Sequence, residues 1–222
     1  MGVGRRGSYT RPVSEPLFDH DLPPALALVP VKSFRAAKGR LAGALDEAAR
    51  AGLARAMAEV VLAAAHPLGV AVVCDDDDVA AWAREHGAAV VWTPGLGLNG
   101  ALAAAIDRVA GAGVRRVVIA HADLPFARDL ARFAAAPPDT VLLVADRRGD
   151  GTNVMSLPTG TGIGLHYGPG SFTAHRAAAT AAGLTVEVVH DEALGWDVDE
   201  PGDLHPPAHL GPLPELPEGV QP

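Results

Sequence analysis

Short runs of β-branched and small apolar residues recur along this chain, and most of them are separated by stretches with helical periodicity. The most informative run is 115–125, Arg-Arg-Val-Val-Ile-Ala-His-Ala-Asp-Leu-Pro. Its apolar part, 117–120, is typical of a strand that is buried on both faces of a parallel sheet. The pattern therefore predicts an α/β fold, and it places Asp123 at the carboxyl end of a central strand, where such folds keep their chemistry.

The other elements follow from the same periodicities. Alternation of strand and helix is strict as far as residue 145 and breaks at a polar turn, 146–152, and a glycine-rich loop, 159–170. The chain of 222 residues, 49% hydrophobic, suits one domain over 25–204, with flexible tails at 1–24 and at the proline-rich 205–222. The expected strands are 25–31, 69–74, 88–92, 140–145, 153–157 and 184–190, and the expected helices are 46–65, 80–86, 99–110, 128–134 and 171–182.

Charge and composition exclude several classes of function. A formal net charge of -8 argues against nucleic-acid binding, which needs a basic face. No apolar run approaches the roughly 20 residues that cross a bilayer, so we expect no membrane contact. The single cysteine, Cys74, rules out a disulfide framework and fits a reducing compartment. These features predict a cytoplasmic protein.

Carboxylates form the first candidate constellation. Asp197 and Asp199 are one residue apart, so in an extended segment both point the same way while Val198 points into the protein. Together with Asp123 they could supply the oxygen ligands that Mg²⁺ prefers. The alternative is a solvated surface pair. The acidic run 75–78 could also bind a metal, but a helix-capping role is favoured for it.

A glycine-rich junction, 168–173, leads straight into a predicted helix. Free backbone N–H groups at a helix start bind anions, and the Ser171 hydroxyl adds a donor. Thr152 is a further donor in the turn that precedes the neighbouring strand. A phosphate or carboxylate would fit here, and the alternative is a plain loop with Ser171 as the helix N-cap.

Basic residues cluster in the loop after the first strand, where Lys32, Lys38 and Arg40 could neutralise a triphosphate. A solvated loop is the simpler alternative, but all three constellations should meet at one edge of the sheet. For His121, hydrogen-bonded packing is favoured over catalysis. The first strand-to-helix turn lacks the Gly-x-Gly-x-x-Gly spacing of dinucleotide-binding enzymes, and the chain has no Walker A sequence.

Seven motifs in register give the chain a family resemblance over about 28–204. They are Leu28-Val-Pro-Val-Lys32, Ala37-Lys-Gly-Arg-Leu41, Leu98-Asn-Gly-Ala-Leu102, Ala122-Asp-Leu-Pro125, Gly149-Asp-Gly-Thr-Asn153, Tyr167-Gly-Pro-Gly-Ser-Phe172 and Trp196-Asp-Val-Asp199. Together they resemble the guanylyltransferases of deazaflavin coenzyme F-420 biosynthesis. The resemblance implies a three-layer α/β/α, Rossmann-like nucleotidyltransferase fold with a mostly parallel mixed sheet.

The resemblance also implies a reaction and roles for residues. Family members transfer GMP from GTP to a small phosphorylated three-carbon acid, which is phosphoenolpyruvate, 2-phospho-L-lactate or 3-phosphoglycerate, and the first of these is favoured here. The residues implied are Asp123, Asp197 and Asp199 for Mg²⁺, Thr152, Gly168 and Ser171 for the acceptor phosphate, Lys32, Lys38 and Arg40 for the GTP phosphates, and Leu98, Asn99 and Gly100 for the nucleoside.

Other readings of the sequence stay open. One is a metal-dependent sugar-nucleotide glycosyltransferase, since an Asp-x-Asp motif binds metal on a related fold. Another is a module that binds GTP without turnover. The product with phosphoenolpyruvate would be labile, so a downstream transferase that takes it up directly is an expected partner. A monomer and a homodimer are both compatible with the sequence.

Overall fold

A seven-stranded mixed sheet forms the centre of the computed structural model, which describes residues 23–215. The strands lie in the order β3-β2-β1-β4-β6-β5-β7, and all neighbours are parallel except β6, which is antiparallel to β4 and β5. The prediction of a mostly parallel mixed sheet is confirmed. Strand bounds are β1 (Ala25–Pro30), β2 (Gly69–Cys74), β3 (Ala89–Trp92), β4 (Arg116–Ala120), β5 (Thr140–Ala145), β6 (Thr152–Pro158) and β7 (Thr185–Val188).

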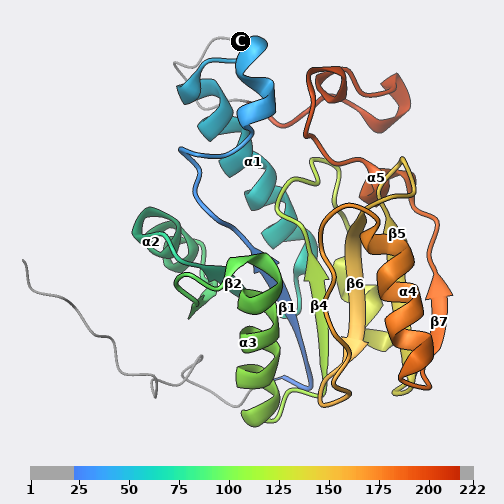
Figure 1. The fold of residues 1–222 in the computed structure, drawn as a ribbon. Coiled ribbons are helices and arrows are strands. Elements are labelled where there is room, and N and C mark those ends of the chain that lie inside the picture. The colour runs from blue at the N-terminus through green and yellow to red at the C-terminus, as the bar shows by residue number, and fades with distance from the viewer. Residues whose placement is uncertain (1–22, 216–222) are drawn as a thin grey trace, which may run out of the picture.

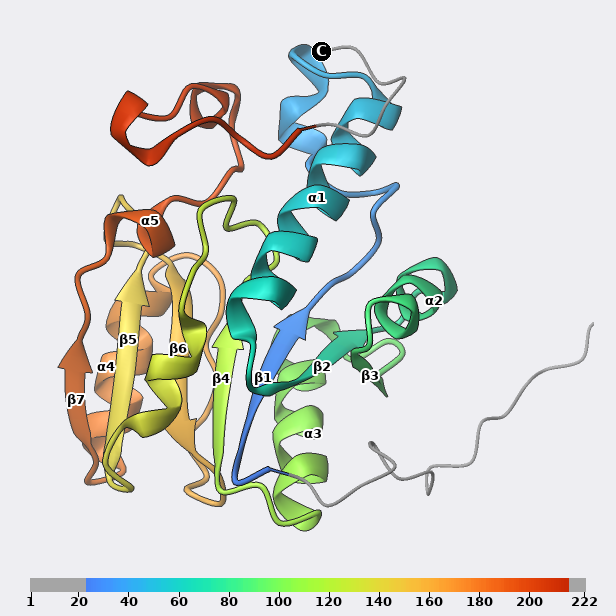
Figure 2. The ribbon, with the colours of Figure 1, turned by 180° about the vertical axis from the view of Figure 1, so that it is seen from behind.

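Helices cover both faces of the sheet and complete three layers. One face packs against α1, α2 and η2, and the other against α3 and α4, which Figures 1 and 2 show from opposite sides. The α-helices are α1 (Glu47–Ala65), α2 (Asp77–Glu85), α3 (Gly97–Gly111), α4 (Ser171–Ala181) and α5 (Glu192–Gly195). The 3-10 helices are η1 (Gly39–Gly43), η2 (Leu130–Ala135), η3 (Pro201–Leu204) and η4 (Ala208–Leu210).

Strand β4 is the middle strand of the seven, as its unbroken apolar run indicates. Val117, Val118, Ile119 and Ala120 are all 0% exposed, because helices cover them on both faces. Alternate residues of the strand enter the two separate cores, with Val118 on one side and Ile119 on the other. Burial of this extent is the main source of the strand's stability.

The reversed direction of β6 shapes the carboxyl edge of the sheet. Because β6 runs opposite to β4, its first residue, Thr152, lies at the edge where β4 ends. The loop 159–170 then begins at the opposite edge, where the Thr159 amide donates to the Arg115 carbonyl, 2.9 Å away. It returns along the sheet to the start of α4, where the Phe172 amide donates to the carbonyl of Asp150. The loop therefore delivers Ser171 to the same edge as Thr152.

A third apolar cluster lies at this edge and joins distant parts of the chain. It contains Leu41 of η1, three turns of α1 and Val198, which is 0% exposed. Trp196, Leu204 and Leu213 pack against it. The cluster ties the basic loop after β1 to the Asp-x-Asp segment, and it confirms that Val198 points into the protein.

Several helix starts differ from the sequence prediction or refine it. Helix α2 begins at Asp77, earlier than predicted, and the Asp76 carboxylate caps it by accepting the Val79 amide at 3.0 Å. The capping interpretation of the acidic run is therefore confirmed for Asp76. Helix α3 begins at Gly97 rather than at Asn99, and the predicted helix near 128–134 is the 3-10 helix η2.

The two predicted tails differ in how much of them is described. The segment 1–24 lies outside the described residues except for its last two, and of these Pro24 accepts the amides of Arg115 and Arg116. Residues 205–215 are described and include η4, while 216–222 are not. Within 23–215, none of the helices combines the length and apolar character that crossing a membrane requires.

Candidate active site

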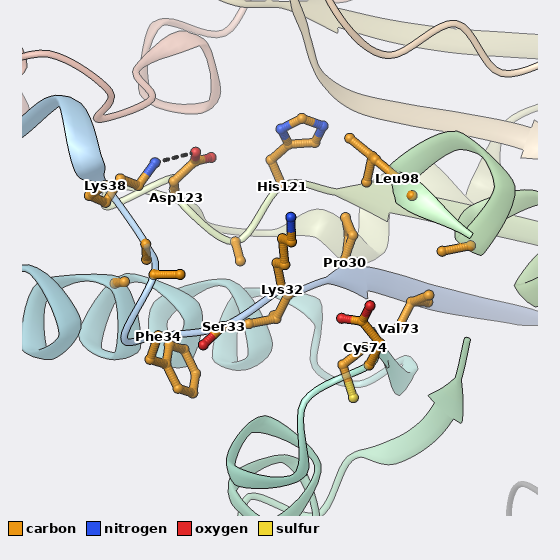
Figure 3. Close-up of a pocket in the computed structure, with 18 of the residues that line it drawn as sticks. Pro30, Lys32, Ser33, Phe34, Lys38, Val73, Cys74, Leu98, His121 and Asp123 are labelled. Atoms are coloured by element: carbon orange, nitrogen blue, oxygen red, sulfur yellow. Dashed lines mark hydrogen bonds and ion pairs between the residues drawn. The ribbon is translucent and has the colours of Figure 1, made fainter. Parts of the chain in front are cut away.

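A cavity of about 590 Å³ opens at the carboxyl edge of the sheet, between the loop after β1, the end of β4 and the start of α3. Figure 3 shows Lys32 projecting into it from that loop, with His121 and Leu98 on its walls. The predicted site residues that line it are Lys32, Lys38, Arg40, Leu98, Asp123 and Asp199. The structure thus brings the basic loop and two of the three acids to one cavity, as the sequence predicts.

Lys38 is a cation of the cavity that pairs with both Asp123 and Asp199. Its Nζ lies 2.5 Å from Asp123 Oδ2 and 2.9 Å from Asp199 Oδ1, and the first of these contacts is drawn in Figure 3. Its backbone has φ 56° and ψ 38°, a left-handed conformation that costs a non-glycine residue about 1 kcal/mol or more. The exposed side chain of Arg40 also pairs with Asp199, with its Nη1 3.9 Å from Asp199 Oδ2. The two acids therefore hold Lys38 in an otherwise unfavourable backbone conformation.

The charges of this pair reinforce each other. Burial alone would lower the pKa of Lys38, but Asp123 and Asp199 raise it above its usual value. Burial alone would raise the pKa of Asp123, but the Lys38 ammonium holds it below its usual value. The Lys38 ammonium and the Asp123 carboxylate are therefore both charged at neutral pH, and a ligand in the cavity meets both charges.

Asp197 lies deeper than its two partners and does not line the cavity. It is 8% exposed, and its Oδ1, like Asp123 Oδ1, is a buried oxygen with no hydrogen-bond partner in the described part of the chain. Burial, followed by the nearby charge of Asp123, raises the pKa of Asp197 to about 6. Two unpartnered carboxylate oxygens suit a cation.

In this structure Asp123, Asp197 and Asp199 are not arranged as a metal site. Across residues 23–215, no three His, Cys, Asp or Glu side chains are grouped closely enough to hold an ion. The ammonium of Lys38 lies between Asp123 and Asp199 instead. The donor set fits a divalent cation in its chemistry, and a cation bound there would compete with Lys38.

Replacing Asp197 with Asn is expected to stabilise the protein at pH 8 by about 3 kcal/mol in buffer without divalent cations. The folded pKa of about 6 lies above the ordinary aspartate value of 3.8, so the cost of the buried charge is fully present above pH 6 and vanishes below about pH 4. Thermal melting of both proteins at pH 4 and pH 8 measures this. Asp129→Asn, at a side chain that is 63% exposed, is the control. An equal gain at both pH values would contradict the prediction.

Asp203 anchors the segment that carries Asp197 and Asp199. It is 0% exposed, and its Oδ2 accepts the amides of Asp199 and Glu200, each at 2.8 Å. Its other oxygen accepts from the Arg147 guanidinium, which also stacks on Trp196 at 4.3 Å. The amide of Val198 donates to the Asp123 carbonyl at 3.2 Å. These contacts fix the Asp-x-Asp segment beside the end of β4.

The residues predicted to bind the acceptor phosphate form a second group, which lies beside the acids and does not line the cavity. Thr152 and Ser171 are each 2% exposed, and their hydroxyl oxygens are 3.5 Å apart. Gly168 precedes Ser171 in the loop and has φ 135°, a conformation open to glycine. Thr152 is followed by Asn153, whose carbonyl accepts the His121 amide at 3.0 Å. The structure therefore brings the two hydroxyls together next to the acidic end of β4.

The helix start behind Ser171 is less free than the sequence predicts. The Gly170 amide donates to Asp150 Oδ2 at 3.1 Å, the Ser171 amide to the Gly168 carbonyl and the Phe172 amide to the Asp150 carbonyl. The expectation of unoccupied N–H groups at this junction is thus wrong for these three amides. The reason is the polar turn 146–152, which folds back and places Asp150 against the helix start. The helix N-cap is Gly170 rather than Ser171.

The residues predicted to bind the nucleoside have two different roles in the structure. Leu98 lines the cavity and is 41% exposed, an unusual exposure for a large apolar side chain. Asn99 instead holds the loop 159–170, because its amide donates to the Tyr167 carbonyl at 3.0 Å and its oxygen accepts the Tyr167 amide at 2.7 Å. A Cβ at Gly100 would lie 3.3 Å from Leu96 Cβ, so Gly100 allows close packing at the helix start.

Some cavity residues were not predicted. Thr93, Gly97 and Ser33 line the cavity, and Gly97 has φ 63°. A signal for Gly97 existed, since residues 95–100 carry Gly-x-Gly-x-x-Gly spacing after the third strand instead of the first. His121 also lines the cavity, while its Nε2 is buried without a partner in the described chain. That orphaned nitrogen does not support the predicted role of His121 in hydrogen-bonded packing.

Comparisons with known proteins agree with this architecture. A family model described as guanylyl transferase, CofC like, matches residues 25–206. A phosphoenolpyruvate guanylyltransferase of Sphaerobacter thermophilus is 33% identical over 195 residues, covering 85% of this chain and 94% of that protein. One from Rubrobacter xylanophilus is 37% identical over 186 residues, covering 80% and 90%.

Solved structures share the fold at lower sequence identity. A protein from Desulfovibrio desulfuricans, described as a nucleotide-diphospho-sugar transferase, superposes with a TM-score of 0.68 at 18% identity and covers 82% of this chain and 85% of its own. The basic loop, the acids at the sheet edge and the match of one family model to most of the chain lead to a single assignment. The chain belongs to the CofC-like guanylyl transferases.

Proposed function

We propose that the protein transfers GMP from GTP to the phosphate of phosphoenolpyruvate and releases pyrophosphate. The product would be enolpyruvoyl-2-diphospho-5'-guanosine, a precursor in coenzyme F-420 biosynthesis. The observation that carries the proposal is the cavity in which Lys38 and Arg40 meet Asp123 and Asp199, next to the hydroxyls of Thr152 and Ser171. The relatives named as phosphoenolpyruvate guanylyltransferases support the choice of acceptor.

The cavity lining suits the nucleotide. Lys32 and Arg40 extend from the loop after β1 and would meet the triphosphate, while the exposed apolar surface of Leu98 would pack against the nucleoside. Fixed cations neutralise the charge that develops on the departing pyrophosphate. The volume of about 590 Å³ falls in the range of small-molecule sites.

The reaction needs positioning rather than a general base. An acceptor phosphate is already an anion at neutral pH, so one of its oxygens can form the new bond to the α-phosphorus of GTP. The bond from that phosphorus to the bridging oxygen breaks, and pyrophosphate leaves with the electron pair. Thr152 and Ser171 would hold the acceptor in line, and the basic loop would orient the nucleotide.

We further propose that Mg²⁺ is the cofactor and that Asp123, Asp197 and Asp199 hold it. The unpartnered oxygens of Asp123 and Asp197 fit such an ion. When bound, Mg²⁺ would neutralise phosphate charge and polarise the α-phosphate. The ion would occupy the space that the Lys38 ammonium fills, and this would leave Lys38 available for the GTP phosphates.

We propose a cytoplasmic enzyme that acts as a monomer or homodimer and hands its labile product to a downstream transferase of the pathway. The same chemistry on 2-phospho-L-lactate or 3-phosphoglycerate is the alternative, because hydroxyl donors recognise any phosphate. Membership of the CofC-like guanylyl transferases favours this reaction over a glycosyltransferase or a GTP sensor.

The deciding experiment incubates the protein with Mg²⁺, GTP and each of the three acids in turn. Pyrophosphate release and guanosine products are followed by coupled assay and mass spectrometry. We expect release that depends on the acceptor and is fastest with phosphoenolpyruvate. ATP and CTP in place of GTP are the matched controls. Binding of GTP with no acceptor-dependent pyrophosphate would sink the transferase proposal.

A further inference from the structure

The side chain of His175 lies wholly inside the protein, beside the two hydroxyls proposed to hold the acceptor. It is 0% exposed, and both of its ring nitrogens have partners. The backbone amide of His166 lies 2.9 Å from His175 Nε2, and Thr152 Oγ1 lies 3.0 Å from His175 Nδ1. This histidine therefore links the loop 159–170 to the first residue of β6.

The partner of Nε2 decides where the ring proton lies. A backbone N–H can only donate, so Nε2 of His175 must accept. A neutral imidazole carries one hydrogen, which must then be on Nδ1 and point at Thr152 Oγ1. Burial, followed by the nearby His166 and His121, lowers the pKa of His175 to about 4, so the ring is neutral at physiological pH.

The tautomer of His175 determines which hydrogen bonds the Thr152 hydroxyl can make. Its oxygen accepts from His175 Nδ1 on one side and faces the Ser171 hydroxyl, a donor at 3.5 Å, on the other. A hydroxyl has two lone pairs and one hydrogen, and the Nδ1–H of His175 occupies one lone pair, so Thr152 cannot donate to His175. The 3.5 Å contact is longer than an ordinary hydroxyl hydrogen bond, so the Ser171 hydrogen can turn toward a bound acceptor instead. Among residues 23–215 no further acceptor takes the Thr152 hydrogen. Thr152 is thus prepared to donate to a group from outside the protein.

A neighbouring donor points to the same conclusion. The ring of Tyr167 packs edge-on against His175, with centroids 4.7 Å apart. Its side-chain oxygen is buried and has no partner within the described chain, although Tyr167 as a whole is 8% exposed. Burial raises the pKa of Tyr167, so this group stays a neutral donor. Unmatched buried donors on two side chains that both contact His175 indicate a ligand that supplies acceptors.

We propose that His175 is a positioning residue: by donating from Nδ1 it fixes the Thr152 hydroxyl as a donor toward an anionic group of the acceptor. This inference rests on the proposed function, in which Thr152 and Ser171 hold that acceptor. It adds a specific requirement, namely that the acceptor presents at this point an oxygen that accepts a hydrogen bond, as a phosphate or carboxylate oxygen does, rather than a group that can only donate. His175 itself acts through Thr152 and is not expected to touch the acceptor.

Two conservative variants separate the two hydrogen bonds of His175. In His175→Gln the side-chain oxygen can still accept the His166 amide, but the donor to Thr152 is lost. In His175→Asn the amide nitrogen lies near the place of Nδ1 and can still donate to Thr152, while the contact to the loop is lost. We expect His175→Gln to raise the KM for phosphoenolpyruvate about tenfold, the scale of one hydrogen bond to a charged group, with the KM for GTP unchanged.

The Asn variant should behave in the opposite way. Its KM for phosphoenolpyruvate should stay within about threefold of the wild type, while its melting temperature falls below that of the Gln variant. His209→Gln, at a side chain that is 61% exposed and far along the chain, is the matched control for the loss of a histidine. Equal acceptor KM values for the Gln and Asn variants would overturn the inference.

A double-mutant cycle tests whether His175 acts through Thr152. Thr152→Val removes the hydroxyl and keeps the shape, so it should raise the acceptor KM by a similar factor. If the inference is right, His175→Gln adds nothing further in the Thr152→Val background. Multiplication of the two effects would show that His175 acts by another route and would overturn it.

The tautomer can be measured directly on the wild-type protein. Nitrogen-15 NMR of the His175 ring should show the hydrogen on Nδ1, whether or not any variant folds. A hydrogen on Nε2 would overturn the inference. Failure of the wild type to release pyrophosphate would instead refute the proposed function, so the two failures are distinguishable.

Discussion

Replacing Asp123 with Asn is expected to lower turnover by about a thousandfold or more while the fold is retained. The neutral amide can still accept a hydrogen bond from Lys38, so the end of β4 keeps its contacts. It cannot hold a divalent cation or balance the ammonium charge, and both are needed in the proposed reaction. The measurement is kcat for acceptor-dependent pyrophosphate release, with melting temperature as the check on folding.

A matched control distinguishes the loss of this carboxylate from the loss of any aspartate. Asp129→Asn removes an acid whose side chain is 63% exposed and whose backbone, with φ 48°, is one that Asn tolerates. We expect full activity from it. An Asp123→Asn protein that turns over within tenfold of the wild type would show that Asp123 is not part of the catalytic centre.

Replacing Asp203 with Asn is expected to destabilise the protein by about 3 kcal/mol, which corresponds to a fall in melting temperature of roughly 6–12 °C. The buried carboxylate accepts from Arg147 on one side and from two backbone amides on the other. An amide group cannot accept on both sides, so one set of donors is left unmatched. Activity should fall as well, because Asp199 loses its anchor.

The effect of this substitution should depend on pH in one direction. Burial alone would raise the pKa of Asp203, but Arg147 and the amides of Asp199 and Glu200 hold it below its usual value. Its contribution is therefore present above the unfolded pKa of about 3.9 and is lost as the pH falls through the folded pKa. The difference between wild type and variant should shrink on acidification below about pH 4.

Urea unfolding at pH 7 and at pH 3.5 measures this difference. The control is Glu192→Gln, which breaks an ion pair with His209 whose two side chains are 60% and 61% exposed. Exposed pairs contribute less than about 1 kcal/mol, so we expect little change at either pH. A difference for Asp203→Asn that stays constant from pH 7 to pH 3.5 would contradict the role given to its charge.

Much of the fold could be predicted because it depends on local patterns. The apolar run 117–120 has one stable environment, a doubly covered strand, and the structure places it there. The capping role predicted for the acidic run is confirmed for Asp76, because a capping carboxylate is satisfied by an amide only three residues away. The helix starts were less exact, since glycine-rich stretches such as 95–100 carry little capping information.

The sequence predicts which residues belong to the site better than it predicts the contacts between them. The sequence indicates that Lys38 and Asp123 face one edge, but the ion pairs of Lys38, which has a left-handed backbone, join it to acids from two distant segments. Likewise the contact of Thr152 with His175 depends on the reversal of β6 and on the path of the following loop. Such pairings are tertiary, and no local pattern encodes them.

That reversal of β6 sets a minimum length for the loop 159–170. The loop starts where β6 ends and must return along a seven-residue strand, a distance of about 23 Å, before α4 can begin beside Thr152. About seven extended residues would span that distance, and the loop has 12. Deletions of a few residues outside the Asn99 contact at Tyr167 are therefore compatible with chain closure. Deletions beyond about five would pull Ser171 away from the sheet edge and separate the two hydroxyls.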